Sequence, residues 1–174
     1  YDEPNCFNSR MAHYGKFENV KNYIAMVGAK APDLEERCGY YGERIVLKAQ
    51  ELGLNTCWVK LTYKKVPGAF VIGPGEKLVI VIALGYGETQ GTPHRGKSMD
   101  QVSSAGAEMP DWFRSGMEAV LLAPTAVNQQ KFLFTLTGNS VKAEAPRGAC
   151  TLIDLGIAKY HFELGAGTEN FTWA

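Results

Sequence analysis

The amino-acid sequence predicts an α+β fold in which helices flank a mostly antiparallel central sheet. Helical and strand patterns intermix along the chain without strict strand–helix–strand alternation, which argues against a parallel α/β sheet. Two strand-like runs, residues 132–137 and 140–145, are joined by the turn residues Gly138-Asn139, as in an antiparallel hairpin. The chain has 174 residues, 45% of them hydrophobic, which suits one domain or one subunit of a compact oligomer.

The first strand and the first helix are marked by their ends. Residues 20–28 form an apolar, β-favouring run that stops at a glycine. A helix is expected to begin at Pro32-Asp33 and to end at Gly53, with apolar residues at steps of three and four. Gly39 and Gly42 lie inside it, where each glycine costs about 1 kcal/mol relative to alanine. We therefore expect another backbone to pack closely against them.

The rest of the chain continues the mixed pattern. Residues 54–61 form a second strand, and residues 78–84 (LVIVIAL) lack polar alternation, so this strand is expected at the centre of its sheet. Proline and glycine mark residues 64–75 as mostly loop, and residues 85–107 are also loop-rich. The remaining expected elements are a helix over 111–123 ended by Pro124, the hairpin, a helix over 152–165 and a short strand at 171–173.

Charge and cysteine content narrow the class of protein. Lys+Arg 18 equals Asp+Glu 18, and a chain without a basic surplus is unsuited to nucleic acid or an anionic membrane as its main partner. The longest apolar run is far shorter than the ~20 residues of a membrane-spanning helix. The cysteines show no Cys-x-x-Cys spacing and no His-x-x-x-His occurs, so no metal site is expected. With no signal-peptide pattern at its start, the chain is expected to be cytoplasmic with reduced thiols.

A formal phosphate-loop motif, G-x-x-x-x-G-K-S, runs from Gly91 to Ser98. Its context does not fit, because the preceding strand is expected to end near Leu84 and no long amphipathic helix follows Ser98. Arg95 and Lys97 nevertheless place two cations on one loop, which can bind an anion without nucleoside-triphosphate chemistry.

A second candidate segment, residues 122–130 (LAPTAVNQQ), follows the helix that Pro124 ends. Its small residues let a ligand approach the backbone, and Asn128 and Gln130 add carboxamides. A carboxamide offers a donor and an acceptor, which suits the alternating edge of a flavin pyrimidine ring. A helix-capping turn is the alternative interpretation.

Five segments, taken together and in order, resemble the FMN-dependent nitroreductase family, in particular its Putative TM nitroreductase branch. They are residues 39–42 (GYYG) leading to 49–58 (AQELGLNTCW), then 79–86, 95–98, 122–130 and 153–162. The resemblance implies a single domain over residues 1–174, built as a sandwich that forms an intertwined homodimer with FMN at the subunit interface.

The resemblance also implies which residues bind the cofactor: Trp58, Val59, Lys60, Arg95, Lys97, Pro124, Thr125, Asn128 and Gln130. Arg95 and Lys97 would hold the FMN phosphate. Asn128 would bond the isoalloxazine or ribityl group with support from Gln130, and residues 58–61 would run along the ring with a backbone N–H near N5.

One family element has no counterpart. The family begins with an Arg-Arg-Ser-x-Arg element whose arginines grip the flavin, and the early arginine Arg10 does not match it. Either that element precedes Tyr1, or the chain binds flavin weakly or not at all.

The implied activity is an NAD(P)H oxidoreductase that works through flavin N5. NAD(P)H would give a hydride, and a nitroaromatic or quinone-like acceptor would take the electrons at the same face in a ping-pong cycle. This scheme needs no side-chain acid or nucleophile, so no catalytic residue is assigned. The alternatives are a flavin- or small-molecule-binding dimer without turnover and a P-loop nucleotide hydrolase using Gly91 to Ser98.

Other polar side chains have a structural interpretation. His161 shares a helix stripe with apolar residues and is expected in the core or an interface. Asp154 is expected to cap the last helix, and Glu43 is expected on a solvated helix face with Arg44, Lys48 and Glu51.

Overall fold

A computed structural model describes residues 4–7, 20–61, 63, 66–105 and 109–174. The chain divides into two compact units, one drawn from residues 1–34 and 44–91 and the other from 35–43 and 92–174. Helix α1 (Leu34–Glu51) contributes residues to both units. The single domain over residues 1–174 stays a prediction.

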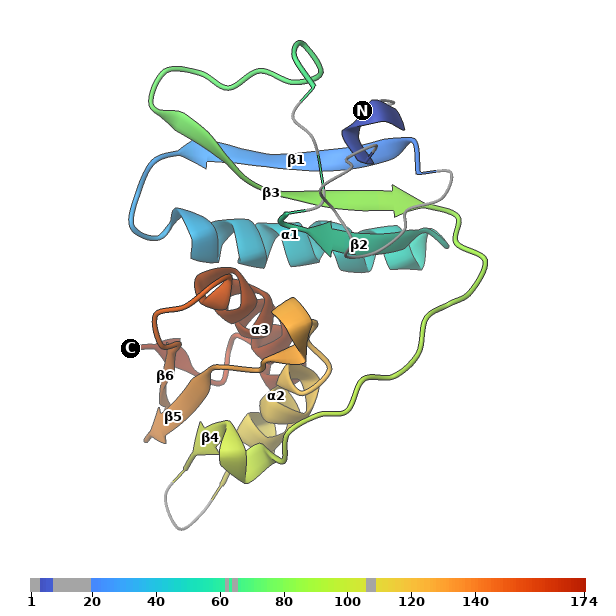
Figure 1. Cartoon of the computed structure of the whole chain (residues 1–174). Helices are drawn as coiled ribbons and strands as arrows, with labels where there is room; N and C mark the ends of the chain where they lie inside the picture. The colour runs from blue at the N-terminus through green and yellow to red at the C-terminus, as the bar shows by residue number, and fades with distance from the viewer. Residues whose placement is uncertain (1–3, 8–19, 62, 64–65, 106–108) are drawn as a thin grey trace. The chain divides into compact units, whose positions relative to one another are not determined.

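The first unit contains a three-stranded antiparallel sheet with strand order β1-β3-β2. Its strands are β1 (Asn22–Ala29), β2 (Asn55–Val59) and β3 (Glu76–Gly85), which coincide with the three predicted runs. The central position predicted for residues 78–84 is confirmed, because β3 pairs with both neighbours (Figure 1) and residues 79–83 are buried. The strand that lacks polar alternation thus lies at the centre of its sheet, as expected for a strand buried on both faces.

A small apolar cluster packs against this sheet. Its buried residues are Cys6, Tyr23 and Val81. The Tyr23 ring meets Phe7 and Phe70 edge to face, with ring centroids 6.0 Å and 6.3 Å apart. Edge-to-face rings are a favourable aromatic arrangement, so the short helix η1 (Pro4–Phe7) is held to the sheet by side-chain packing.

The second unit combines two helices with a four-stranded sheet of order β4-β5-β6-β7. The helices are α2 (Asp111–Val120) and α3 (Thr151–Ala166), and the strands are β4 (Ser103–Ser104), β5 (Leu133–Thr137), β6 (Ser140–Glu144) and β7 (Thr172–Trp173). The predicted hairpin is confirmed as β5 and β6 in antiparallel register. Gly138 supplies its turn with a φ of 60°, a left-handed conformation that glycine adopts without strain.

Close helix packing explains the glycine at position 39. A Cβ there would overlap the backbone carbonyl oxygen of Ile153 on α3. The packing is reciprocal, since a Cβ at Gly156 would overlap the carbonyl oxygen of Glu36 on α1. The predicted close approach of another backbone is therefore confirmed at Gly39.

Aromatic side chains form the core between α3 and the second sheet. The Phe134 and Phe162 rings are stacked with centroids 5.3 Å apart, and Trp173 lies 5.6 Å from Phe162. The Trp173 indole N–H donates to Glu163 at 2.9 Å, while the Lys159 ammonium lies 4.7 Å from the centre of its ring. The last strand is thus held by ring packing, one hydrogen bond and a cation–π contact.

The α+β class predicted from the sequence is confirmed, with one correction to the sheet. The described strands lie in two sheets rather than in one central sheet. Three of the pairings are antiparallel, and the two parallel ones involve the two-residue strands β4 and β7. The sandwich and the homodimer stay predictions. Among the described residues, no helix combines the length and the apolar character needed to cross a membrane.

Candidate functional site

Two segments of the second unit are joined by hydrogen bonds: residues 94–98, here called the cation loop, and residues 125–130, here called the amide turn. The Asn128 amide donates to the backbone oxygen of Arg95 at 2.8 Å. The Lys97 backbone N–H donates to Gln130 Oε1 at 2.6 Å, and its ammonium donates to the Gln130 backbone oxygen at 2.8 Å. Two pairs of residues 33 positions apart, Arg95 with Asn128 and Lys97 with Gln130, are therefore brought together, while their binding of FMN stays a prediction.

The amide turn is closed by its own hydrogen bonds. Gln130 is 3% exposed, and its backbone N–H donates to Thr125 Oγ1 at 3.1 Å. The Gln130 side-chain N–H donates to Asn128 Oδ1 at 3.0 Å, so the two carboxamides are linked to each other. Pro124 precedes this closed turn, but the prediction that it ends the helix at residue 123 is wrong, because α2 already ends at Val120, four residues before the proline.

The backbone of the amide turn is strained. Val127, Asn128 and Gln130 have φ values of 47°, 54° and 44°. The left-handed region costs a non-glycine residue about 1–2 kcal/mol, and β-branched Val127 is among the least suited residues to it. Its side chain is also 76% exposed, so burial does not offset this cost. The turn's own hydrogen bonds and contacts from outside it together hold this shape.

Helix α3 supplies such contacts through Asp154. This carboxylate is 2% exposed; Oδ1 accepts from the Ala126 backbone N–H at 3.0 Å and Oδ2 accepts from the Gln129 amide at 2.7 Å. Burial raises the pKa of Asp154, and the two hydrogen bonds oppose that rise. The predicted helix cap is wrong, because the cap position is Cys150 and the Asp154 carboxylate binds the amide turn instead.

The cation loop presents its charges to solvent. Arg95 and Lys97 are both exposed, although their backbones are held by Asn128 and Gln130. Within the described residues, no carboxylate pairs with either cation, and the Arg95 guanidinium has no hydrogen-bond partner. The Lys97 ammonium donates to the Gln130 backbone oxygen and has further N–H groups, so a fixed backbone carries two cations that no carboxylate neutralises, which suits a site for an anionic group.

The carboxamides have a different immediate role from the predicted one. Asn128 and Gln130 bind the cation loop and each other, so in this structure they position the two cations. The helix-capping alternative is not supported either, because Thr125, not an amide, holds the cap position of the short helix η3 (Ala126–Asn128). The bond from Asn128 to a flavin stays a prediction.

The other predicted cofactor residues belong to the first unit. Trp58 pairs with Ile82, and Val59 is 3% exposed on β2. The Lys60 ammonium donates to the Val79 backbone oxygen at 2.8 Å. Their place along the flavin ring stays a prediction.

The comparison with known families supplies the remaining evidence. The family model described as Putative TM nitroreductase matches residues 1–166. The chain belongs to this family. A crystal structure of a putative nitroreductase from Thermotoga maritima is 25% identical with a TM-score of 0.64, covering 82% of this chain and 59% of that one. The chain thus spans less than two thirds of that structure, and no curated protein matches it.

This nitroreductase-family chain does not form a phosphate loop at Gly91 to Ser98. Strand β3 ends at Gly85, well before the motif. Ser98 caps only the three-residue helix η2 (Met99–Gln101), through a reciprocal capping box with Gln101. A phosphate loop needs a strand directly before it and a long helix directly after it, so the motif is a coincidence of sequence.

The cation loop of this nitroreductase-family chain fits the phosphate end of a phosphate-bearing cofactor. The donors at the cation loop are an unpaired guanidinium and an ammonium, which are strong ligands for phosphate oxygens. Arg10, the early arginine that does not match the family's first element, lies outside the described residues.

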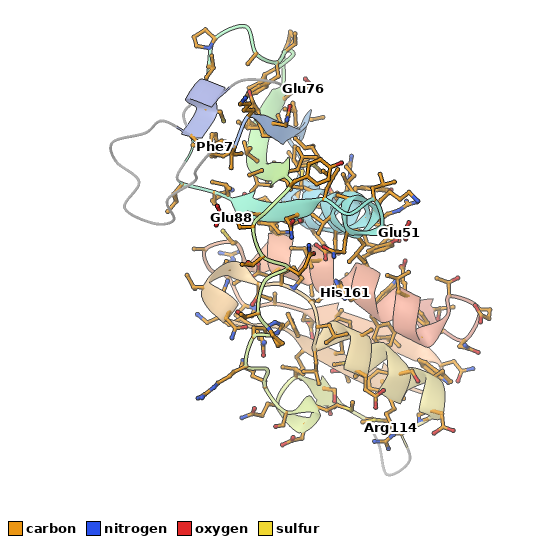
Figure 2. The ribbon with its side chains drawn as sticks, turned by 90° about the vertical axis from the view of Figure 1, so that its right-hand side faces the viewer. Phe7, Glu51, Glu76, Glu88, Arg114 and His161 are labelled. Atoms are coloured by element: carbon orange, nitrogen blue, oxygen red, sulfur yellow. The ribbon has the colours of Figure 1, made fainter. Side chains whose placement is uncertain are left out.

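Three side chains, of which Asp154 and Glu43 are buried, were not assigned a role from the sequence or were assigned the wrong one. Asp154 and Gln129 form the support of the amide turn. Glu43 was expected on a solvated face, but it is 1% exposed and its Oε1 lies 2.9 Å from His161 Nε2. The core position predicted for His161, on α3 (Figure 2), is confirmed. Glu43 follows Gly39 by four residues and shares its helix face, a signal of close packing.

Proposed function

We propose that this chain is an FMN-dependent NAD(P)H oxidoreductase that reduces nitroaromatic or quinone-like acceptors. The observation that carries the proposal is the cation loop, where Arg95 and Lys97 are exposed while Asn128 and Gln130 fix their backbones. Membership of the nitroreductase family supports an oxidoreductase rather than another class of phosphate-binding protein.

The chain's own residues would bind and orient, not react. Arg95 and Lys97 would hold the phosphate of FMN, and Asn128 would approach the ribityl or ring edge from the amide turn. Trp58 and Lys60 would lie along the ring, as the family resemblance implies. When bound, FMN would supply the redox chemistry, with hydride entering at N5 from NAD(P)H and electrons leaving to the acceptor in a ping-pong cycle. No side-chain acid or nucleophile is needed for this scheme.

The proposal includes a homodimer in the cytoplasm. Helix α1 exposes Tyr41 and Ile45 at 52% and 40%, and Leu52, the residue directly after the helix, is 63% exposed. Exposed apolar side chains on one helix face are typical of an interface, and a second copy of the chain would cover them.

The proposed compartment is the cytoplasm. The cysteines Cys6, Cys38, Cys57 and Cys150 are free thiols, which suits a reducing compartment. The proposed dimer has its own test. Light scattering of the purified chain tests the dimer.

A titration with FMN tests the proposed function. The chain should bind FMN, shifting its visible absorbance and quenching its fluorescence. Adding NADH or NADPH should bleach the bound flavin, and a nitroaromatic or a quinone should restore its colour. Binding without bleaching would identify a flavin-binding protein without turnover. Absence of binding would overturn the proposal.

A further inference from the structure

Asp154 is a buried carboxylate that binds no ligand in the proposed function. It lies in the first turn of α3, and both of its oxygens accept hydrogen bonds from the amide turn rather than from the N–H groups of its own helix. The bonds enter the turn at two points, the Ala126 backbone and the Gln129 side chain. Gln129 also donates to the Ala149 backbone oxygen at 3.0 Å, which ties the same amide to the start of α3.

Alternate residues of the amide turn contact different partners. Ala126 and Gln129 face Asp154, whereas Asn128 and Gln130 face the cation loop. Because the backbone between them is left-handed at Val127, the turn does not keep this shape through its own preference. Among the described residues, the turn has two charged hydrogen-bond partners: the ammonium of Lys97 on one side and the Asp154 carboxylate on the other.

We infer that Asp154 is a positioning residue for the cation loop: it fixes the amide turn, and through Asn128 and Gln130 it fixes the backbones of Arg95 and Lys97. The contacts form a continuous path from α3 to the Lys97 N–H. The identity of the ligand that the cations receive rests on the proposed function, but the path itself does not.

The chemistry of the contact makes asparagine a discriminating replacement. Asp154 offers two acceptors to two donors, the Ala126 N–H and the Gln129 amide. An Asp154→Asn side chain keeps the shape but offers one acceptor and one donor, so one contact becomes donor against donor. Rotation of the Gln129 amide would correct that contact only by turning its oxygen toward the Ala149 carbonyl. The substitution therefore weakens the support without emptying the site.

The test is amide hydrogen exchange, measured by NMR on the full chain without flavin. In Asp154→Asn, exchange should become about tenfold faster at Ala126 and also at Lys97, whose N–H does not contact Asp154. Glu36→Gln is the matched control, since it removes the 2.7 Å ion pair with Lys159 in the same unit and leaves the turn untouched. Rates are compared after correction for each variant's global unfolding free energy. Faster exchange at Ala126 with an unchanged rate at Lys97 would overturn the inference.

A complementary pair of variants keeps the test decisive if single substitutions perturb folding. Gln129→Glu alone places a second carboxylate against Asp154 and should also speed exchange at Lys97. Combined with Asp154→Asn, it restores the donor–acceptor contact between positions 129 and 154 but loses the bond to Ala149, so the double variant should lose less protection than the sum of the two single losses. Additive losses in the double variant would contradict the inference.

An FMN arm separates this inference from the proposed function. If FMN binds, its affinity should fall about tenfold in Asp154→Asn and remain unchanged in Glu36→Gln. If FMN does not bind the unmodified chain, the proposed function fails, while the exchange rate at Lys97 still decides whether Asp154 positions the loop.

Discussion

His161 on α3 and Glu43 on α1 meet in the interior of the second unit, with His161 Nε2 lying 2.9 Å from Glu43 Oε1. His161 Nδ1 lies 3.1 Å from the Ala119 carbonyl oxygen, which can only accept, so Nδ1 carries a proton. The other nitrogen, Nε2, lies 2.9 Å from Glu43 Oε1, and this contact needs a second proton on one of the two atoms. The pair is therefore satisfied only when it holds that proton, and removing either partner leaves a buried polar group.

Glu43→Ala should lower the free energy of unfolding by roughly 3–5 kcal/mol, because it leaves His161 buried without its partner. Urea unfolding followed by circular dichroism measures the change. Glu51→Ala, which removes an exposed ion pair with Lys48 on the same helix, should leave the midpoint unchanged. Equal effects of the two substitutions would contradict the buried pair.

Gly39→Ala should destabilise the protein although helix propensity favours alanine. Propensity alone predicts a gain of about 1 kcal/mol, but the added Cβ overlaps the Ile153 carbonyl oxygen. Overpacking of this kind costs roughly 1–3 kcal/mol, so the packing effect should decide the sign. A higher denaturation midpoint for the variant would show that α1 and α3 do not pack this closely.

Arg95→Ala should weaken FMN binding about ten- to a hundredfold, since a charge-assisted bond to phosphate contributes roughly 1.5–3 kcal/mol. Fluorescence titration gives the dissociation constant. Arg114→Ala is the control, because Arg114 is an exposed arginine on α2 in the same unit (Figure 2). If both variants bind FMN as tightly as the unmodified chain, Arg95 does not hold the phosphate.

Asp154 should give stability a pH dependence of defined sign. Burial raises its pKa above the ordinary 3.8, so the folded state keeps a proton that the unfolded state releases. Its contribution to stability is fully present below 3.8 and is lost as pH rises through the raised folded value. The unfolding free energy of the unmodified chain, compared with Asp154→Asn, should therefore fall from acidic toward neutral pH. Urea unfolding at a series of pH values measures this difference. A difference that grows from acidic toward neutral pH would show that folding does not raise the pKa of Asp154.

Local sequence patterns predicted most of the fold. The apolar run of β3 and the hairpin around Gly138 lie where periodicity and turn residues placed them. Strand β4 was not predicted, because two serines in a loop carry no strand pattern and pair only through β5. The assignment of strands to two sheets likewise depends on long-range pairing that no local pattern encodes.

The candidate site was harder to predict than the fold. The approach of Arg95 to Asn128 followed from family resemblance, not from any spacing in the chain. The left-handed Val127 runs against the preference of a β-branched residue, so propensity could not find it. The role of Asp154 depends on where the amide turn folds back, whereas its sequence position suggested only a helix cap.

Trp173 provides an optical reporter for the end of the chain. Its indole is in contact with a carboxylate and an ammonium as well as aromatic rings, so its emission should depend on whether β7 is docked. Trp112, stacked on Phe171, would report on the neighbouring segment. With the other tryptophans replaced by phenylalanine, fluorescence of a single indole could distinguish fraying of the last strand from collapse of the whole unit.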